Sequence, residues 1–523
     1  MLLQPLIVLG LLLARGGVCA PPNVLFILAD DMGLWAARTY GNPEIYTPNI
    51  DKLAEEGLKF NQAFCNTPVC SASRTSYFTG RLPSQHNVHD WIAGGNGCTD
   101  EGIFYTRYET AYTDVLTRNN YTCGISGKYH LGDQPVPQHS FTHWFVHQRG
   151  GGDYINPPLV QNLKCVTLDG YVTDIITDDA IEYLNNYTKS GAKRPFYLSV
   201  HYTAPHSPYT GSDGKASSMH PPDIVKLYDN ATFVSCPQEP MSPYADRGWV
   251  AGGLTRQCLG NRECLKGYYA AVTAMDLNIG RMLDTLKMNN LDRTTLVVFS
   301  SDHGFNAGHH GLWGKGNAAY PLNMFDTSLR IPMIWRHLGV VQPGVEESVV
   351  QVVDVAPTLL AYAGNFSFPK NSNLAGESFL DLLLDPSKRN SRKGRTIYGE
   401  YGQARYARVN SSMKYIARLT GHIELYNLET DANETHNLVE PFSTTAEKFD
   451  AELLMYDRAM RQYFSFLEDP YVSGWDKSVT GLGQLRAVYY NKTGWPNSPP
   501  FVGLQEQGYR VCSDPRANAC SVV

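Results

Sequence analysis

The most regular feature of the sequence is a set of short apolar runs separated by amphipathic stretches. Four runs have the length and continuity of strands buried on both faces of a sheet: residues 23–29, 196–202, 295–300 and 331–335. Between them, residues 50–57 follow Pro48 with helical spacing, and 268–288 carry their apolar side chains along one stripe. Strands that alternate with helices predict an α/β fold with a large, mainly parallel sheet sandwiched by helices.

The pattern changes after about Asp385. Residues 385–393 are polar and rich in Arg, Lys and Ser, which is typical of a linker. Short β-like runs then follow at hairpin spacing over 396–401, 406–409, 414–419 and 422–427, and 446–466 has helical spacing. We therefore expect a larger domain over 21–385. A smaller C-terminal domain, with an antiparallel sheet, a helix and a tail, is expected over 394–523.

Residues 1–20 are predicted to be a signal peptide, because an apolar run precedes small residues near Ala20. That run is too short to cross a bilayer and no later segment is long enough, so we expect no membrane span. The 523 residues, 43% of them hydrophobic, suffice for more than one core. A net charge of −6 gives no reason to expect a nucleic-acid partner.

Sequons and cysteines agree with passage through the secretory pathway. Seven N-x-S/T sequons are present, at Asn120, Asn186, Asn230, Asn365, Asn410, Asn433 and Asn491. Of the eleven cysteines, Cys258 and Cys264 are close enough to close a short loop, as are Cys512 and Cys520. The connectivity of the other cysteines stays open.

Two of the predicted strands end in acidic clusters. Asp30 and Asp31 follow the first strand, and Asp302 and His303 follow the third. In open α/β sheets, ligands bind beyond the carboxyl ends of the strands, where gathered carboxylates need a cation between them. A single Asp pair is as readily a loop or helix cap, but two clusters at two strand ends favour a metal site.

A further signal is Cys70, which is expected to begin a helix with Arg74 one turn further on the same face. A helix N-terminus together with a guanidinium group makes a good oxyanion site. Taken alone, the Cys-x-x-x-Arg pattern favours a buried or disulfide-bonded cysteine instead.

These segments resemble the signatures of the type I sulfatases, a formylglycine-dependent, arylsulfatase-like family of the alkaline phosphatase superfamily. Cys70-Ser-Ala-Ser-Arg74, followed by Thr79-Gly80-Arg81, is similar to the formylglycine signature of that family. Further similar segments follow in the family's order, at 127–132, 204–208, 301–304, 308–316 and 424–438. The resemblance implies an alkaline-phosphatase-like fold and hydrolysis of sulfate esters.

The resemblance also implies a modified nucleophile. A dedicated formylglycine-generating enzyme of the secretory pathway would oxidise Cys70 to 3-oxoalanine (formylglycine). The hydrated aldehyde carries two hydroxyls on one carbon; one attacks sulfur, and the second lets the sulfated intermediate collapse with release of sulfate. A serine would stall after one turnover.

The family assigns roles to the other matching residues. A divalent ion, Ca²⁺ rather than Mg²⁺, would be held by Asp30, Asp31, Asp302, His303 and the oxygen derived from Cys70. Arg74 and Lys128 would stabilise the aldehyde hydrate, and His130 would orient or deprotonate it. His206 and Lys315 would bind sulfate and protonate the departing alcohol. His201 and His309 are weaker candidates.

Two departures from the family pattern affect details of this reading. Ala72 stands where substrates of the modifying enzyme most often have Pro, which leaves the extent of Cys70 conversion open. His303 stands where many members have Asn, and nitrogen is a softer ligand than Ca²⁺ prefers.

Hydrolysis of a sulfate ester of an alcohol, phenol or sugar is the favoured function. A phosphate mono- or diester hydrolase of the same superfamily is an alternative, as is an inactive binding protein with this fold. We expect the protein to be secreted or lysosomal. The natural substrate and the oligomeric state stay open; loop aromatics such as Trp91, Trp144 and Tyr154 are candidates for stacking on a sugar or an aryl ring, or for packing.

Overall fold

The computed structural model describes residues 20–92, 105–132, 135–245, 251–402, 404–410, 412–418, 423–439, 450–466, 510–511 and 521–522. The predicted signal peptide (but for Ala20), the Asn491 sequon and the cysteines Cys512 and Cys520 lie outside these described residues. In the part of the chain that is described, no helix combines the length and the apolar character needed to cross a bilayer.

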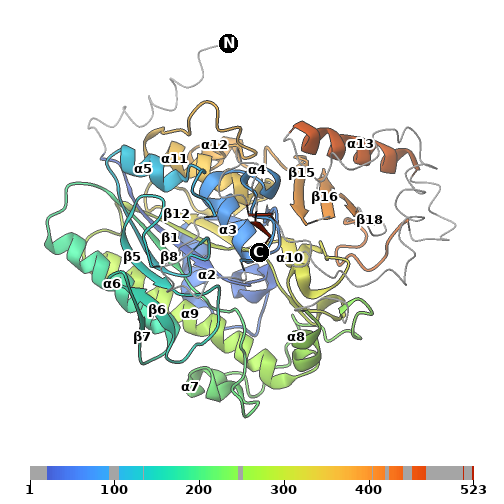
Figure 1. The fold of residues 1–523 in the computed structure, drawn as a ribbon, viewed down its shortest axis with the longest axis horizontal. Helices are drawn as coiled ribbons and strands as arrows, with labels where there is room; N and C mark the ends of the chain where they lie inside the picture. Colours follow the sequence, from blue (N-terminus) through green and yellow to red (C-terminus); the bar gives the residue numbers. More distant parts are fainter. Residues whose placement is uncertain are drawn as a thin grey trace.

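A ten-stranded sheet forms the centre of the molecule (Figure 1). Its strands lie in the order β13 (Gly344–Glu346), β2 (Leu58–Phe60), β12 (Met333–Arg336), β9 (Thr295–Ser301), β1 (Asn23–Ala29), β8 (Phe196–His201), β4 (Thr122–Gly127), β5 (Phe141–His147), β6 (Pro158–Gln161) and β7 (Lys164–Thr167). The strands from β9 to β5 are parallel to one another, whereas β12 and β6 pair antiparallel on either side. The sheet is mixed but mostly parallel, as the sequence predicts.

The four predicted strands are β1, β8, β9 and β12, each within two residues of its expected ends. The sequence did not predict β4 and β5, because glycine, serine and histidine interrupt their apolar pattern. Gly124 shows why the pattern breaks in β4: a Cβ atom there would lie 3.1 Å from His143 and 3.2 Å from Leu198. These distances are shorter than most Cβ contacts, so the packing between β4 and its neighbours favours glycine.

Helices cover both faces of the sheet (Figure 1). Val24, Phe26 and Leu28 of β1 pack on the side of α3, α5, α11 and α12, whereas Leu25 and Ile27 pack on the side of α2, α6 and α9. Both sets are fully buried, which explains the continuous apolar run of β1. The helices are α2 (Pro48–Glu56), α3 (Cys70–Thr79), α4 (Pro83–His86), α5 (Tyr112–Arg118), α6 (Val172–Lys189), α7 (Pro222–Lys226), α8 (Ala251–Cys258), α9 (Arg262–Met288), α10 (Asp326–Leu329), α11 (Val355–Gly364) and α12 (Leu380–Leu384).

The C-terminal part contains the antiparallel sheet that hairpin spacing predicts. Its four strands are β15 (Ile397–Tyr401), β16 (Ala404–Val409), β17 (Met413–Arg418) and β18 (Glu424–Asn427), and α13 (Asp450–Phe466) packs against β16 and β17. Two-stranded pairs complete the fold: β3 (Ala63–Phe64) with β14 (Val350–Gln351), β10 (Asn306–Ala307) with β11 (Trp313–Gly314), and β19 (Arg510–Val511) with β20 (Ser521–Val522). The domain boundary near 385–393 stays a prediction.

Candidate active site

The acidic clusters meet because β1 and β9 are neighbours. Ala29 pairs with Ser301 in the parallel register, so the residues that follow each strand emerge at one edge of the sheet. The backbone N–H of Asp31 donates to Oδ1 of Asp302 at 3.2 Å, and that of Asp302 donates to Ala29 at 3.1 Å. All these groups are buried, so the carboxylates face one another rather than solvent.

Cys70 is the first residue of α3 and lies against this edge. Its Sγ is 3.6 Å from Oδ1 of Asp30, 3.5 Å from Nε2 of His303 and 2.9 Å from Nζ of Lys315. Every residue of α3 is buried, including the helix start at Cys70. The structure thus places the predicted nucleophile in the carboxylate cluster.

Arg74 lies one turn after Cys70 and links α3 to the residues that follow β9 and β4. Its Nε donates to Oδ2 of Asp302 at 3.0 Å, and its Nη1 donates to the carbonyl of Lys128 at 2.9 Å. The Nη2 group is fully buried 3.7 Å from Asp30 and has no hydrogen-bond partner among the described residues. A buried guanidinium with one free edge suits an anion.

The segments after β4 and β8 contribute the next three residues. Lys128 follows β4, and its Nζ donates to Oδ2 of Asp30 at 2.5 Å. His130 has a positive φ of 61° and a buried ring, with Nε2 3.0 Å from the carbonyl of Ile92. His206 follows β8, and its Nε2 is 3.8 Å from Oδ2 of Asp31.

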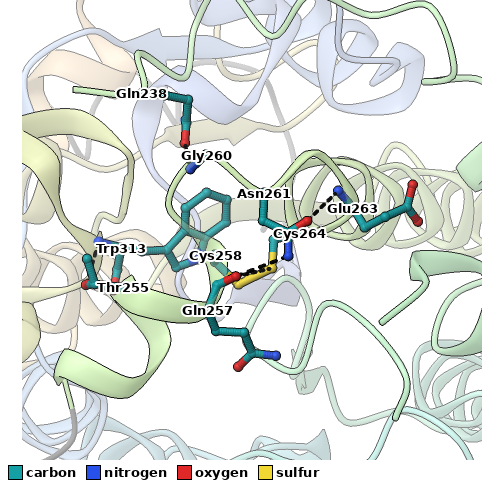
Figure 2. The surroundings of a disulfide bond; sticks show 9 residues. All are labelled: Gln238, Thr255, Gln257, Cys258, Gly260, Asn261, Glu263, Cys264 and Trp313. Carbon is teal, nitrogen blue, oxygen red and sulfur yellow. Dashed lines mark hydrogen bonds between the residues drawn. A yellow bond between two sulfur atoms is a disulfide. The ribbon is translucent and has the colours of Figure 1, made fainter. Parts of the chain in front are cut away.

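Lys315 reaches the site from the turn after β11, where its Nζ donates to Oδ1 of Asp31 at 2.7 Å. Figure 2 shows the surroundings of Trp313, two residues before Lys315. The Cys258–Cys264 disulfide joins the end of α8 to the start of α9. On α8, the Thr255 hydroxyl donates to the Trp313 carbonyl at 3.3 Å and accepts from the Trp313 N–H at 3.1 Å. The cysteine spacing predicts this disulfide-closed loop. Helix α8, which the disulfide joins to α9, therefore helps to position Trp313 and the residues up to Lys315.

The donor set fits a divalent cation. One atom each from Asp30, Asp31, Cys70 and His303 lies within 4.8 Å of all the others. Oδ1 of Asp30 is approached only by Cys70 and Arg74 at 3.6 and 3.7 Å, and Oδ2 of Asp31 only by His206 at 3.8 Å, among the described residues. Carboxylate oxygens that lack close nitrogen or oxygen donors are suited to bind a cation. The fifth predicted ligand, Asp302, lies beside this group, with Oδ1 3.6 Å from Nε2 of His303.

The charges of the site shift its pKa values in a consistent way. Burial is the largest single influence on Asp30 and pushes its pKa upward, but Lys128, His206 and Arg74 together outweigh it and lower that pKa to about 2. Burial likewise raises the pKa of the Cys70 thiol, yet Lys128 and Lys315 hold it well below its usual range. Burial lowers the pKa of His130, which favours a neutral ring able to accept a proton. The site therefore stabilises negative charge at the Cys70 position.

The weaker candidates lie outside the ligand cluster. His201 is buried beneath Lys128, with Nδ1 3.3 Å from the carbonyl of that residue. His309 packs against the ring of Trp35, and its Nδ1 accepts from the N–H of Ala307. Among the loop aromatics, Trp144 packs against Tyr129, and the Tyr154 hydroxyl donates to the carbonyl of His206 at 2.8 Å.

Sequence reasoning missed a glycine segment that lies against both catalytic histidine candidates. A Cβ atom at Gly150 would lie 2.0 Å from Cε1 of His130, and one at Gly151 would lie 2.9 Å from Nδ1 of His206. The run of glycines at 150–152 was the available signal. The backbone of this segment therefore limits where the two rings can lie.

The chain matches known proteins over most of its length. The family model described as "Sulfatase" matches residues 22–365, and the one described as "N-sulphoglucosamine sulphohydrolase, C-terminal" matches 308–457. The N-acetylglucosamine-6-O-sulfatase of Bacteroides thetaiotaomicron is 27% identical over 472 residues, which cover 79% of each chain. The human iduronate 2-sulfatase is 27% identical over 400 residues, covering 65% of this chain and 69% of that one.

Solved structures show the same architecture. Ps i-CgsB in complex with k-i-k-neocarrahexaose superposes with a TM-score of 0.66 at 25% identity, covering 89% of this chain and 98% of that one. A protein in complex with its substrate D-glucosamine-2-N,6-O-disulfate superposes with a TM-score of 0.67 at 22% identity, covering 86% and 99%.

Proposed function

The chain belongs to the sulfatase family and hydrolyses sulfate esters, and from this premise we propose that it removes sulfate from a sugar. Its nucleophile is a formylglycine formed from Cys70, and its cofactor is a calcium ion. The observation that carries this proposal is the position of Cys70 Sγ, 3.6 Å from Asp30 and 2.9 Å from Lys315, within one buried set of metal-ligand atoms.

The metal would be held by Asp30, Asp31, Asp302 and His303, with the oxygen that replaces Cys70 Sγ. When bound, a divalent cation polarises the sulfate group and favours ionisation of a nearby hydroxyl. Oxygen ligands predominate in this set, which favours Ca²⁺ over softer ions. Chelation should remove activity, and Ca²⁺ should restore it more fully than Mg²⁺; metal analysis of the purified protein should find about one calcium per chain.

The protein's own side chains supply the rest of the chemistry. The hydrated aldehyde presents two hydroxyls on one carbon, so that one attacks sulfur and the other allows sulfate to leave. Arg74 and Lys128 stabilise the charge at this carbon, and His130 holds or accepts its proton. Lys315, in the turn after β11, and His206, which follows β8, bind sulfate oxygens and return a proton to the departing alcohol.

Burial of α3 sets the order of maturation. Cys70 is 2% exposed and no residue of α3 is accessible in the folded chain. The formylglycine-generating enzyme must therefore act on Cys70 before the chain folds. That order agrees with modification during entry into the secretory pathway and with a secreted or lysosomal destination. The six described sequon asparagines, all exposed, are the proposed glycosylation sites: Asn120, Asn186, Asn230, Asn365, Asn410 and Asn433.

Mass spectrometry of the Cys70 peptide from secreted protein tests the nucleophile. The proposal expects loss of sulfur and gain of a carbonyl; an intact thiol or a disulfide at Cys70 in active protein would contradict it.

A panel of sulfated sugars tests the substrate class, since the relatives named above act on N-acetylglucosamine or iduronate sulfates. Sulfate and phosphate esters of one phenol, assayed in parallel, separate sulfatase from phosphatase activity. Turnover of the phosphate ester alone would overturn the proposal.

A further inference from the structure

Asp90 is an acidic residue at a site whose other substrate-facing groups are cationic. It lies two residues before Ile92, whose N–H donates to Oγ of Ser71 at 3.0 Å and whose carbonyl lies 3.0 Å from Nε2 of His130. Ser71 is the neighbour of Cys70 on α3. The segment 90–92 therefore borders the nucleophile on the side of His130.

Tyr401 connects Asp90 to the opposite side of the same site. The Tyr401 hydroxyl donates to Oδ1 of Asp90 at 2.7 Å. The ring of Tyr401 lies so close to Gly316 that a Cβ atom there would be 2.9 Å from Cδ1. Gly316 follows Lys315, whose Nζ is 2.9 Å from Cys70 Sγ. Asp90 thus lies between the His130 side and the Lys315 side of the site.

The carboxylate of Asp90 is only partly used by the fold. Oδ1 accepts from Tyr401 and from the N–H of Trp91 at 2.8 Å. Among the described residues, none donates to Oδ2. Burial raises the pKa of Asp90 to about 6, and the charges of Cys70 and Lys315 also act on this group.

We propose that Asp90, held by Tyr401, binds hydroxyl groups of the sugar that carries the sulfate, and is thereby a specificity-determining residue; this inference rests on the proposed function. A carboxylate repels the sulfate group, which Arg74, Lys128 and Lys315 attract, so Asp90 faces the part of the substrate beyond sulfur. Sugar hydroxyls donate hydrogen bonds to a carboxylate, whereas the ring of an aryl sulfate has no donor.

The decisive variant is Asp90→Asn, because the amide keeps an acceptor oxygen for Tyr401 and Trp91 and replaces only the free oxygen with a donor. We expect kcat/KM to fall about 10–100-fold on a sulfated monosaccharide and to change less than about 3-fold on 4-nitrophenyl sulfate. Tyr401→Phe is the matched control: it keeps the carboxylate, so the ratio of sugar to aryl activity should change less than in Asp90→Asn.

The outcomes separate the inference from the proposed function. Equal losses on both substrates, or none, would show that Asp90 only supports the loop. A selective loss on choline sulfate, which has a cation and no hydroxyl, would also overturn the inference, as would a wild-type enzyme active on aryl sulfates but on no sugar sulfate. Inactivity of the wild type on every sulfate ester would instead contradict the proposed function.

A substrate-side measurement covers the case in which Asp90→Asn does not fold. Sulfated sugars that lack the hydroxyl next to the sulfate should be hydrolysed about 10–100-fold less efficiently by the wild type. Full activity on these deoxy sugars would overturn the inference.

Discussion

Two clusters that both pair buried carboxylates with Lys and Arg side chains use their carboxylate oxygens differently. Where α10 meets the C-terminal sheet, both oxygens of Asp326 and both of Glu434 accept a hydrogen bond, from Lys414, Arg408 and the N–H of Asp326. At the ends of β1 and β9, one oxygen of Asp30 and one of Asp31 have no hydrogen-bond or ion-pair partner closer than 3.6 Å among the described residues.

The number of protein donors to each carboxylate oxygen distinguishes a structural ion cluster from a functional one. Burial and charge are similar in both clusters, so neither property distinguishes them. In the α10 cluster every carboxylate oxygen has a donor from the protein itself, and nothing further is required. In the strand-end cluster one oxygen of Asp30 has only the Cys70 thiol and the Arg74 guanidinium, and one of Asp31 has only the His206 imidazole, within reach among the described residues, which suits a site that binds a cation.

Replacing the nucleophile should give the largest effect. Cys70→Ala removes the only group that can become formylglycine, so kcat should fall on the order of 10⁴-fold or more. The only polar atom of the Cys70 side chain is its sulfur, and its contact with Asp30 is long, at 3.6 Å. The free energy of unfolding should therefore change little. Steady-state assays with an aryl sulfate, together with urea unfolding, measure both quantities. Residual activity above 1% would remove Cys70 from the nucleophile's role.

The opposite result is expected in the α10 cluster. Lys414→Met leaves the carboxylates of Asp326 and Glu434 facing each other with one cation fewer. Removing one partner of a buried ion pair costs about 3–5 kcal/mol, so the midpoint of urea unfolding should fall accordingly. The activity of each folded molecule should stay near that of the wild type. A stability loss below 1 kcal/mol would show that this cluster does not behave as a buried one.

The glycine segment should affect catalysis without affecting stability as strongly. In Gly150→Ala the new methyl group would meet the ring of His130, so we expect kcat to fall about 10–100-fold, or about 1.4–2.7 kcal/mol. Displacement of the ring should also move the acidic limb of the pH–rate profile, which a general loss of stability would not do. Gly253→Ala on α8 is the matched control, because nothing lies within 4 Å of its position.

Glu434 provides a pH-dependent test of the structural cluster. Burial raises its pKa from 4.5 to about 7, although Lys414 opposes the shift. The folded protein therefore retains a proton that the unfolded chain has released. This contribution to stability is complete below pH 4.5 and is lost as the pH rises through 7.

Glutamine does not titrate, so Glu434→Gln should gain stability relative to the wild type as the pH rises, by about 3 kcal/mol. Urea unfolding of both proteins at acidic and alkaline pH gives this difference. The same replacement at the exposed Glu429 controls for the change in net charge. A pH-independent difference would show that Glu434 is ionised in the folded protein throughout this range.

The sequence predicted those parts of the molecule that depend on contiguous residues. The apolar run of β1, the helix at Cys70 and the acidic strand ends were predicted because each is a local pattern. An apolar run carries no direction, so the antiparallel course of β12 was not predictable. Asp90 and Tyr401 are separated by 311 positions, and no local pattern joins them. Their contact depends on how the C-terminal sheet packs against the strand ends.

The smallest effect is expected for an ion pair of the same chemistry at the surface. Arg281 on α9 pairs with Asp178 on α6, with side chains 47% and 62% exposed, whereas Arg408 and Asp326 are 6% and 14% exposed. Water screens the exposed pair, so a double-mutant cycle over Arg281→Met and Asp178→Asn should give a coupling energy of about 0.2–1 kcal/mol. The cycle is needed because Arg281 also donates to Asn278 at 2.8 Å, and a single variant would remove both interactions. The corresponding cycle over Arg408 and Asp326 should give a larger coupling energy. If it did not, burial would not distinguish structural ion clusters from surface pairs. The contrast with the strand-end cluster would then rest only on the oxygens of Asp30 and Asp31 that lack close donors.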